Sequence, residues 1–182
     1  MTGASGCGVS TLGARLATLG GAVHLDTDGF FWQPTEPPFT RRRPIAERIA
    51  LIRAAFGTSG WILSGSLTGW GDELAAEAEL VVFLEVPTEM RMERLRERER
   101  GRYGDRIDPG GDLHATHLDF MAWSADYDTG LTAGRNRARH LAWLEGLDVP
   151  HIALDGQRPT DDLAEAVLAA VVRGRNAGAT AR

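Results

Sequence analysis

Residues 3–11, GASGCGVST, carry the most specific pattern in the sequence. The first and third glycines and Ser10 have the spacing of the motif G-x-x-x-x-G-K-[ST], in which backbone N–H groups turn inward around an anion. Val9 stands where this motif has lysine. Residues 10–19 predict a helix directly behind the loop, and the positive end of its dipole favours negative charge. The stretch therefore predicts a phosphate-binding loop that lacks its usual cation.

The missing cation cannot come from a lysine elsewhere in the chain, because all twenty basic residues are arginines. A guanidinium group is planar, keeps its charge at neutral pH and binds phosphate through two parallel hydrogen bonds. Any substitute for the lysine is therefore an arginine. Without a substitute, phosphate transfer loses several kcal/mol of transition-state stabilisation.

The composition is that of one ordinary globular domain of 182 residues, with 43% hydrophobic and 25% charged side chains. The net charge of −5 gives no indication of nucleic-acid binding, and we expect neither a membrane span nor a signal peptide. The single cysteine, Cys7, excludes an internal disulfide and fits a cytoplasmic protein. The sequence leaves the oligomeric state open.

Strand-like and helix-like segments alternate along the chain, which predicts an α/β fold with a mainly parallel sheet. The expected strands are Ala22–Asp26, Trp61–Ser64, Leu80–Val86 and Val149–Leu154. The expected helices are Ser10–Leu19, Pro44–Phe56, Thr88–Arg100, His114–Trp123, Leu131–Leu144 and Thr160–Val172. We expect a single domain over residues 1–173 with a long loop at 27–43, a lid at about 101–130 and a disordered tail at 174–182.

Two acids, Asp26 and Asp28, follow the expected strand at residues 22–26. Carboxylates at this spacing can support Mg²⁺ through water and accept a proton from a hydroxyl group, or they can simply cap a turn. The aromatic residues at 30–32 can stack on a ring of a ligand or anchor the loop. The three arginines at 41–43 can bind an acceptor phosphate or carboxylate, but they are more simply explained as a solvated patch.

The helix expected at residues 88–100 is rich in arginine and glutamate. Several Glu–Arg pairs three residues apart favour a solvated helix that pairs its own charges. Arg94 and Arg98 nevertheless share one face, and Arg106 follows in the glycine-rich segment. Gly156 comes two residues after the end of the last expected strand, in what is otherwise an ordinary strand-to-helix turn.

The loop, together with HLDTDGFFW at 24–32, WILSGS at 61–66 and LVVFLEVP at 80–87, resembles the adenylate kinase-like group of P-loop proteins, which includes shikimate kinase. The resemblance covers most of the chain. It implies a three-layer α/β fold, a mainly parallel five-stranded sheet in the order 2-3-1-4-5, ATP and Mg²⁺, and a mobile lid. We expect the first strand of that fold to be missing or truncated, because only two residues precede the loop.

The same resemblance implies site residues. The nucleotide would contact Gly3, Ser5, Gly6, Cys7, Gly8, Val9, Ser10, Thr11, Arg135 and Gly156. Ser10 and Asp26 would organise Mg²⁺, and Asp28 would meet the phosphoryl acceptor, a nucleoside monophosphate or a small hydroxylated metabolite. The arginines that would neutralise the transferring phosphate are Arg94, Arg98 and Arg106.

Three hypotheses about activity follow from Val9. The first is an ATP-dependent phosphotransferase in which an arginine has replaced the lysine, and the sequence does not say which one. The second is a nucleotide-binding module that has lost its chemistry. The third is a slow NTPase that needs no acceptor.

Overall fold

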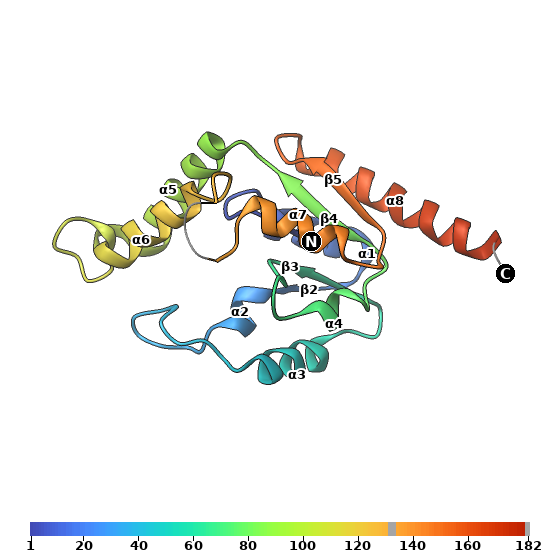
Figure 1. The fold of residues 1–182 in the computed structure, drawn as a ribbon, viewed down its shortest axis with the longest axis horizontal. Coiled ribbons are helices and arrows are strands. Elements are labelled where there is room, and N and C mark those ends of the chain that lie inside the picture. The colour runs from blue at the N-terminus through green and yellow to red at the C-terminus, as the bar shows by residue number, and fades with distance from the viewer. Residues whose placement is uncertain (131–133, 181–182) are drawn as a thin grey trace.

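A computed structural model of the chain describes residues 1–130 and 134–180, and strands alternate with helices along it (Figure 1). The strands are β1 (Thr2–Gly3), β2 (Val23–Asp26), β3 (Trp61–Ser64), β4 (Val81–Glu85) and β5 (His151–Asp155). The helices of the amino-terminal half are α1 (Val9–Gly20), α2 (Thr27–Phe31), α3 (Ile45–Ala55) and α4 (Asp72–Ala75). Those that follow are α5 (Thr88–Tyr103), the 3₁₀ turn η1 (Gly104–Ile107), α6 (His114–Ala125), α7 (Arg137–Glu145) and α8 (Thr160–Thr180).

Backbone ladders join the strands into two parallel sheets, β2-β3 and β1-β4-β5. The expected single sheet in the order 2-3-1-4-5 is therefore not confirmed. β1 has two residues, yet it pairs with β4, so the strand expected to be missing or truncated is present in short form. Met1 N donates to Leu63 O at 2.6 Å and Gly65 N donates to Met1 O at 3.0 Å, so the end of β3 lies beside the start of β1.

Helices cover both faces of the β1-β4-β5 sheet (Figure 1). On one face, α1 and α8 pack Leu12 and Leu163 against Val82 and Leu84 of β4. On the other face, Leu144 of α7 packs against Val81 and Phe83. β4 is thus buried on both sides, which explains why it is a continuous apolar run. The three-layer arrangement holds for this part of the molecule.

A separate core supports the β2-β3 sheet. Ile49 and Ile52 of α3 and Leu74 of α4 pack against Leu63 of β3.

Because α2 begins at Thr27, the expected long loop over residues 27–43 is helical in its first turns. This short helix forms because Asp26 is its N-cap, and its side chain accepts a hydrogen bond from the Asp28 N–H.

The segment expected to be a lid contains the end of α5, then η1 and α6, which extend away from the sheets (Figure 1). The helix expected from Leu131 begins instead at Arg137, and residues 131–133 lie outside the described part of the chain. The expected disordered tail at 174–182 is wrong for residues 174–180, since α8 continues to Thr180, and the remaining two residues lie outside the described part. None of the helices in the described part is long and apolar enough to cross a membrane.

Candidate functional site

The glycine loop joins β1 to α1 and turns on two glycines. Gly6 and Gly8 have φ angles of 83° and 93°, in the left-handed region that side-chain-bearing residues rarely adopt. Gly8 is also the N-cap of α1 and brings no side chain to cap the first turn. The N–H groups at the start of this helix are therefore placed to bind an anion.

The loop is packed closely on one side and open on the other. A Cβ atom added at Gly3 would lie 2.5 Å from Cys7 Sγ, and one added at Gly6 would lie 2.7 Å from a carbonyl oxygen of α5. A Cβ at Gly8 would meet no atom closer than Arg94 Nη1, 4.0 Å away. The first two glycines permit close backbone packing, and the third faces a space large enough for a ligand atom.

Two residues of the loop point away from this space. Cys7 is 1% exposed, and burial raises the pKa of its thiol, so it serves as a packing residue. Val9 packs beside the α1–α8 core, and its carbonyl oxygen accepts a hydrogen bond from Ser64 Oγ at 3.1 Å. The side chain in the lysine position therefore supports the helix and leaves no charge at the loop.

Ser10 and Asp26, the two residues that the resemblance assigns to Mg²⁺, are in direct contact. Ser10 Oγ donates to Asp26 Oδ2 at 2.5 Å, and the other oxygen, Oδ1, accepts from Asp28 N at 3.0 Å. The end of β2 thus brings two acids beside the start of α1. Thr11 is exposed on the first turn of the same helix.

Asp28 stands in a mixed electrostatic environment. Crowding around its carboxyl group removes solvent and raises its pKa, although part of the residue stays exposed, and the charge of Asp26 raises it further. Arg135, Arg98 and Arg102 act in the opposite direction. A carboxyl group whose pKa is raised is a better proton acceptor once it is ionised.

Arg94 and Gly156 lie on the open side of the loop. Arg94 Nη2 donates to the Gly156 carbonyl oxygen at 3.5 Å, and its Nη1 faces Gly8. Gly156 is buried, because a Cβ there would lie 2.6 Å from Val86 Cγ2 and 3.2 Å from the Cys7 carbonyl oxygen. α5 and the turn after β5 therefore form the two sides of the space next to Gly8.

Arg98 and Arg106 are engaged in ion pairs. Arg98 Nη2 lies 2.9 Å from Glu99 Oε1. Arg106 Nη2 lies 2.7 Å from Asp112 Oδ2 and also bonds Glu36, which follows α2. These pairs raise the pKa of Arg106. Arg106 thus links the lid segment to the segment after α2.

Arg135 reaches the loop from the segment before α7. Its Nη2 donates to Ser5 Oγ at 3.1 Å, and its guanidinium carbon lies 5.3 Å from the ring centre of Trp123. Its Nε is buried and has no hydrogen-bond partner within the described residues. Burial lowers the pKa of this guanidinium, which nevertheless stays charged at neutral pH.

Arg91 was not singled out by the sequence reasoning, yet it holds the loop. Its side chain is 1% exposed and donates to Val86 O at 3.1 Å, to Ser124 O at 3.2 Å and to Ser5 O at 3.3 Å. It also pairs with Asp128 at 3.0 Å. The sequence carries only a weak signal for this role, a basic residue in the first turn of a helix that follows a buried strand.

A second missed feature lies beneath α1. His24 Nε2 lies 2.9 Å from Ser64 Oγ, whose proton goes to Val9 O. Because the hydroxyl proton is used in this way, the imidazole is the donor in its bond to Ser64. Ser64 is 0% exposed and joins the start of α1 to β3 through its bond to Val9 O.

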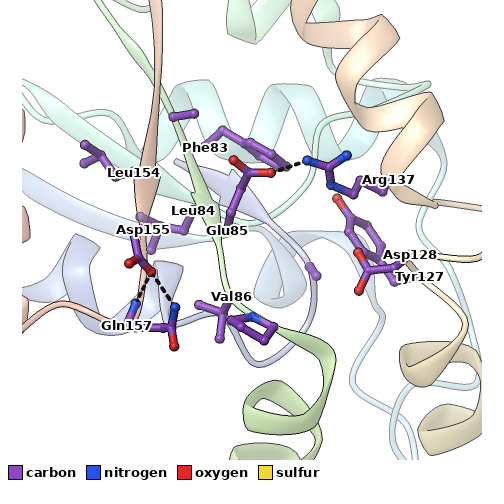
Figure 2. A pocket seen from close by; sticks show the side chains of 13 residues that line it. Phe83, Leu84, Glu85, Val86, Tyr127, Asp128, Arg137, Leu154, Asp155 and Gln157 are labelled. Atoms are coloured by element: carbon purple, nitrogen blue, oxygen red, sulfur yellow. Dashed lines mark hydrogen bonds and ion pairs between the residues drawn. The ribbon is translucent and has the colours of Figure 1, made fainter.

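Two hollows adjoin this region. The first, of about 420 Å³, lies at the carboxyl ends of β4 and β5. Glu85 and Arg137 face each other in it (Figure 2), and Arg137 Nη2 lies 2.6 Å from Glu85 Oε1. Among its lining residues, only Ala4 belongs to the glycine loop. The second, of about 430 Å³, lies beside Asp28. Its lining residues are Asp28, Gly29, Trp32, Gln33, Pro34, Thr35, Pro38, Phe39 and Arg43.

Solved structures with a similar fold are P-loop kinases. The gluconokinase from Sinorhizobium meliloti 1021 superimposes with a TM-score of 0.56 and 17% identity, covering 100% of this chain and 95% of that one. The shikimate kinase from Acinetobacter baumannii, solved in complex with shikimate, gives a TM-score of 0.53 and 17% identity, with 94% and 90% covered. The chain therefore has the fold of the P-loop kinases.

The sequence comparisons give the family. The uncharacterized protein YqaC from Bacillus subtilis (strain 168) is 39% identical over 167 residues, which cover 91% of this chain and 92% of that protein. The chain belongs to the same family as YqaC. No protein-family model matches the chain.

Proposed function

We propose that the protein is an ATP- and Mg²⁺-dependent phosphotransferase that acts on a small-molecule acceptor. The observation that carries this proposal is the hydrogen bond of 2.5 Å between Ser10 and Asp26, at the start of the helix behind the glycine loop. It places a hydroxyl and a carboxylate beside a site built for anions. Asp28, two residues further on, stands next to a hollow suited to an acceptor.

The loop fits the phosphates of a nucleotide. Gly8 faces open space, and the N–H groups at the start of α1 carry the positive end of the helix dipole. In this proposal the backbone from Gly6 to Thr11 holds the phosphates. Arg94 and the turn at Gly156 bound the neighbouring space, in which the rest of the nucleotide would lie.

Oxygen ligands near the loop fit Mg²⁺. Within the described residues, no group of three or more His, Cys, Asp or Glu side chains is arranged to hold a metal ion. This suits Mg²⁺, which usually binds to one or two protein oxygens and completes its shell with phosphates and water. Ser10 and Asp26 would hold the ion, which supplies positive charge to the phosphates during transfer.

The hollow beside Asp28 suits a small acceptor with a negative group. Asp28 would accept the proton of the attacking hydroxyl, since its raised pKa favours proton uptake. Trp32 and Phe39 provide aromatic walls, and Arg43 lies on the same lining. Because arginines outnumber acids around Asp28, we expect an acceptor that carries a phosphate or carboxylate.

A second candidate function is nucleotide binding without phosphate transfer. It is favoured by Val9, which contributes no charge, and by the ion pairs that occupy Arg98 and Arg106. This alternative predicts the same affinity for nucleotide as the phosphotransferase function, but no ADP formation with any acceptor.

Calorimetric titration with ATP and Mg²⁺, followed by a screen of acceptors for ADP formation, separates these functions. We expect binding in the micromolar range, and ADP formation that depends on an anionic acceptor. Ser10→Ala should weaken binding when Mg²⁺ is present and have little effect in its absence. The control is Thr18→Ala, which removes an exposed hydroxyl further along α1 that bonds Ala14 O. Absence of ATP binding by the folded protein would refute both functions, and ADP formation without an acceptor would indicate an NTPase.

A further inference from the structure

The strand β5 forms the outer edge of the β1-β4-β5 sheet, because within the described part of the chain it pairs with β4 alone (Figure 1). Ile152 and Leu154 point to the face where α1 and α8 form the core. His151, Ala153 and Asp155 point to the opposite face, and all three are exposed. Strands of a parallel sheet are normally covered on both faces. One face of β5 is therefore left open, since α7 packs on β4 instead.

The backbone of the three exposed residues is open as well. Val81 N donates to Pro150 O at 2.9 Å, so in this parallel ladder every second residue counted from Pro150 turns its backbone groups towards β4. The residues between them, His151, Ala153 and Asp155, turn theirs outward. Those of His151 and Ala153 have no hydrogen-bond partner in the part of the chain that the structure describes. The edge thus presents donors and acceptors to which another strand can pair.

The sequence of β5 is complementary to itself. When two copies of the strand pair antiparallel about Ala153, His151 of one copy lies opposite Asp155 of the other, on the same face of the sheet. An imidazole N–H then faces a carboxylate at each end of the pair. The outward backbone groups of the three residues meet their counterparts in the same register. A two-fold axis at Ala153 therefore gives the closed contact of a dimer.

Charged residues on an edge strand can instead keep other chains away. Such protection acts on a second copy when like charges meet, whereas the groups opposed here are unlike. Asp155 is also held in place, because its Oδ1 accepts hydrogen bonds from Gln157 N at 3.0 Å and from Gln157 Nε2 at 3.1 Å (Figure 2). These bonds lower the pKa of Asp155, so the carboxylate is charged at neutral pH.

We propose that the protein forms a homodimer in which β5 pairs antiparallel with the β5 of a second copy, so that the β1-β4-β5 sheet continues across both chains. The proposal goes beyond the phosphotransferase function and does not depend on it. A contact through a strand of five residues is smaller than the roughly 1,200 Å² or more of a stable interface. We therefore expect a weak dimer, with a dissociation constant in the micromolar range.

Sedimentation of the full chain at a series of concentrations tests the dimer. We expect a concentration-dependent equilibrium between one chain and two. Hydrogen exchange locates the contact, since the amide protons of His151 and Ala153 should be protected in concentrated protein and exchange rapidly in dilute protein. A monomer at every concentration, or a dimer in which these two amides stay unprotected, would overturn the proposal.

Two substitutions at one position test the register. His151→Asp places like charges opposite each other at both ends of the pair, and the dissociation constant should rise about tenfold or more. His151→Lys keeps a donor opposite Asp155 and should change the dissociation constant less than about threefold. Ser59→Asp, which adds an acid at an exposed turn before β3, is the control and should leave it unchanged.

Thermal melts show whether each variant is folded, and the exchange measurement on the wild-type protein decides the question if one of them is not. No change in the dissociation constant of His151→Asp, or an equal rise in His151→Asp and His151→Lys, would contradict the pairing of His151 with Asp155 and overturn the proposal.

Discussion

Behind the glycine loop, His140 is fully buried between Thr2 and Tyr127. The side of the molecule with the proposed acceptor hollow, called the acceptor side, is different: there Arg106 bonds Glu36 and Asp112 at the surface. The imidazole Nε2 is 2.7 Å from Thr2 Oγ1, and Nδ1 is 2.9 Å from Tyr127 Oη. One region is thus joined by neutral, buried hydrogen bonds, and the other by charges exposed to water.

The two kinds of contact have different strengths. Exposed ion pairs contribute about 0–1 kcal/mol each and weaken in salt, while a buried polar group left without its partner costs about 1–3 kcal/mol. The region behind the glycine loop is therefore fixed in advance. The segments that carry Glu36 and Arg106 can separate at little cost, which is what entry of an acceptor requires.

The largest effect is expected where the two regions meet, at Asp28. Asp28→Asn removes the proposed base while keeping the size of the side chain. We expect the rate of ADP formation with an acceptor to fall about 100-fold or more, with nucleotide affinity nearly unchanged. Steady-state kinetics and calorimetry measure these two quantities separately.

The same substitution has an opposite effect on stability. The pKa of Asp28 is raised in the folded protein, so folding disfavours its ionised form, and stability decreases as pH rises above the ordinary pKa. Asp28→Asn should therefore raise the melting temperature at neutral pH, and only slightly, because Asp28 is partly exposed. Activity of the wild-type protein should fall at acid pH as Asp28 takes up a proton. Unchanged kinetics in Asp28→Asn would show that Asp28 is not the base.

Removing His140 should destabilise the buried region behind the glycine loop. His140→Leu keeps the volume but leaves the Thr2 and Tyr127 hydroxyls without their partner, and we expect a loss of about 2–4 kcal/mol in the free energy of unfolding. Urea denaturation at pH 7 measures it. Arg106→Leu, a large change on the exposed side, is the control and should cost far less.

The pH dependence gives a second check on His140. Burial lowers its pKa to about 3 from an ordinary value of 6.5, so the unfolded chain takes up a proton that the folded protein refuses. The wild-type protein should lose stability as pH falls from about 6.5 towards 3, and the His140→Leu variant should lose less over that range. Equal slopes in the two proteins would contradict this account of the buried region.

The sequence predicted the parts whose signals are local. β3 has the expected bounds, Trp61–Ser64, because a short apolar run between turn residues has few other solutions. The glycine loop follows from a motif whose spacing is local, whereas the closeness of Ser10 and Asp26 was implied only by the resemblance. The α/β alternation falls into the same class.

The sequence could not predict contacts between residues that are distant along the chain. Arg91, Arg94 and Arg98 belong to one helix and have the same chemistry, yet the first is buried, the second faces the loop and the third is paired with Glu99. The burial of Arg91 comes from Asp128 and from backbone groups brought together by folding, and Arg94 meets the turn at Gly156, whereas the pair of Arg98 with Glu99 is local. β1 was expected to be missing or truncated, because two residues are too few to show a hydrophobic pattern. Pairing with β4 nevertheless makes them a strand.

Two glycines of α1, Gly13 and Gly20, test how closely the buried region behind the glycine loop is packed. Alanine normally stabilises a helix relative to glycine by about 1 kcal/mol. At Gly13, however, an added Cβ would lie 2.5 Å from His24 Nε2 and would also contact Ser64, whereas at Gly20 nothing lies within 4 Å. We expect Gly13→Ala to lower the free energy of unfolding by about 1–3 kcal/mol and Gly20→Ala to leave it equal or higher. Stabilisation by Gly13→Ala would show that this packing is loose.

The smallest effect is expected for the link between Arg106 and Glu36. Glu36→Gln removes a charge from the exposed side, while Arg106 keeps Asp112 at 2.7 Å. We expect a change of less than about 1 kcal/mol in the free energy of unfolding, which disappears in high salt. A double-mutant cycle with Arg106→Gln in urea denaturation measures the coupling between the two side chains.

If the pair resists opening of the acceptor side, Glu36→Gln should also speed acceptor binding, with the affinity for Mg²⁺ and ATP unchanged. A coupling of several kcal/mol that persists in salt would mean that the two regions are fixed to the same degree, because a contact that strong does not open for a ligand.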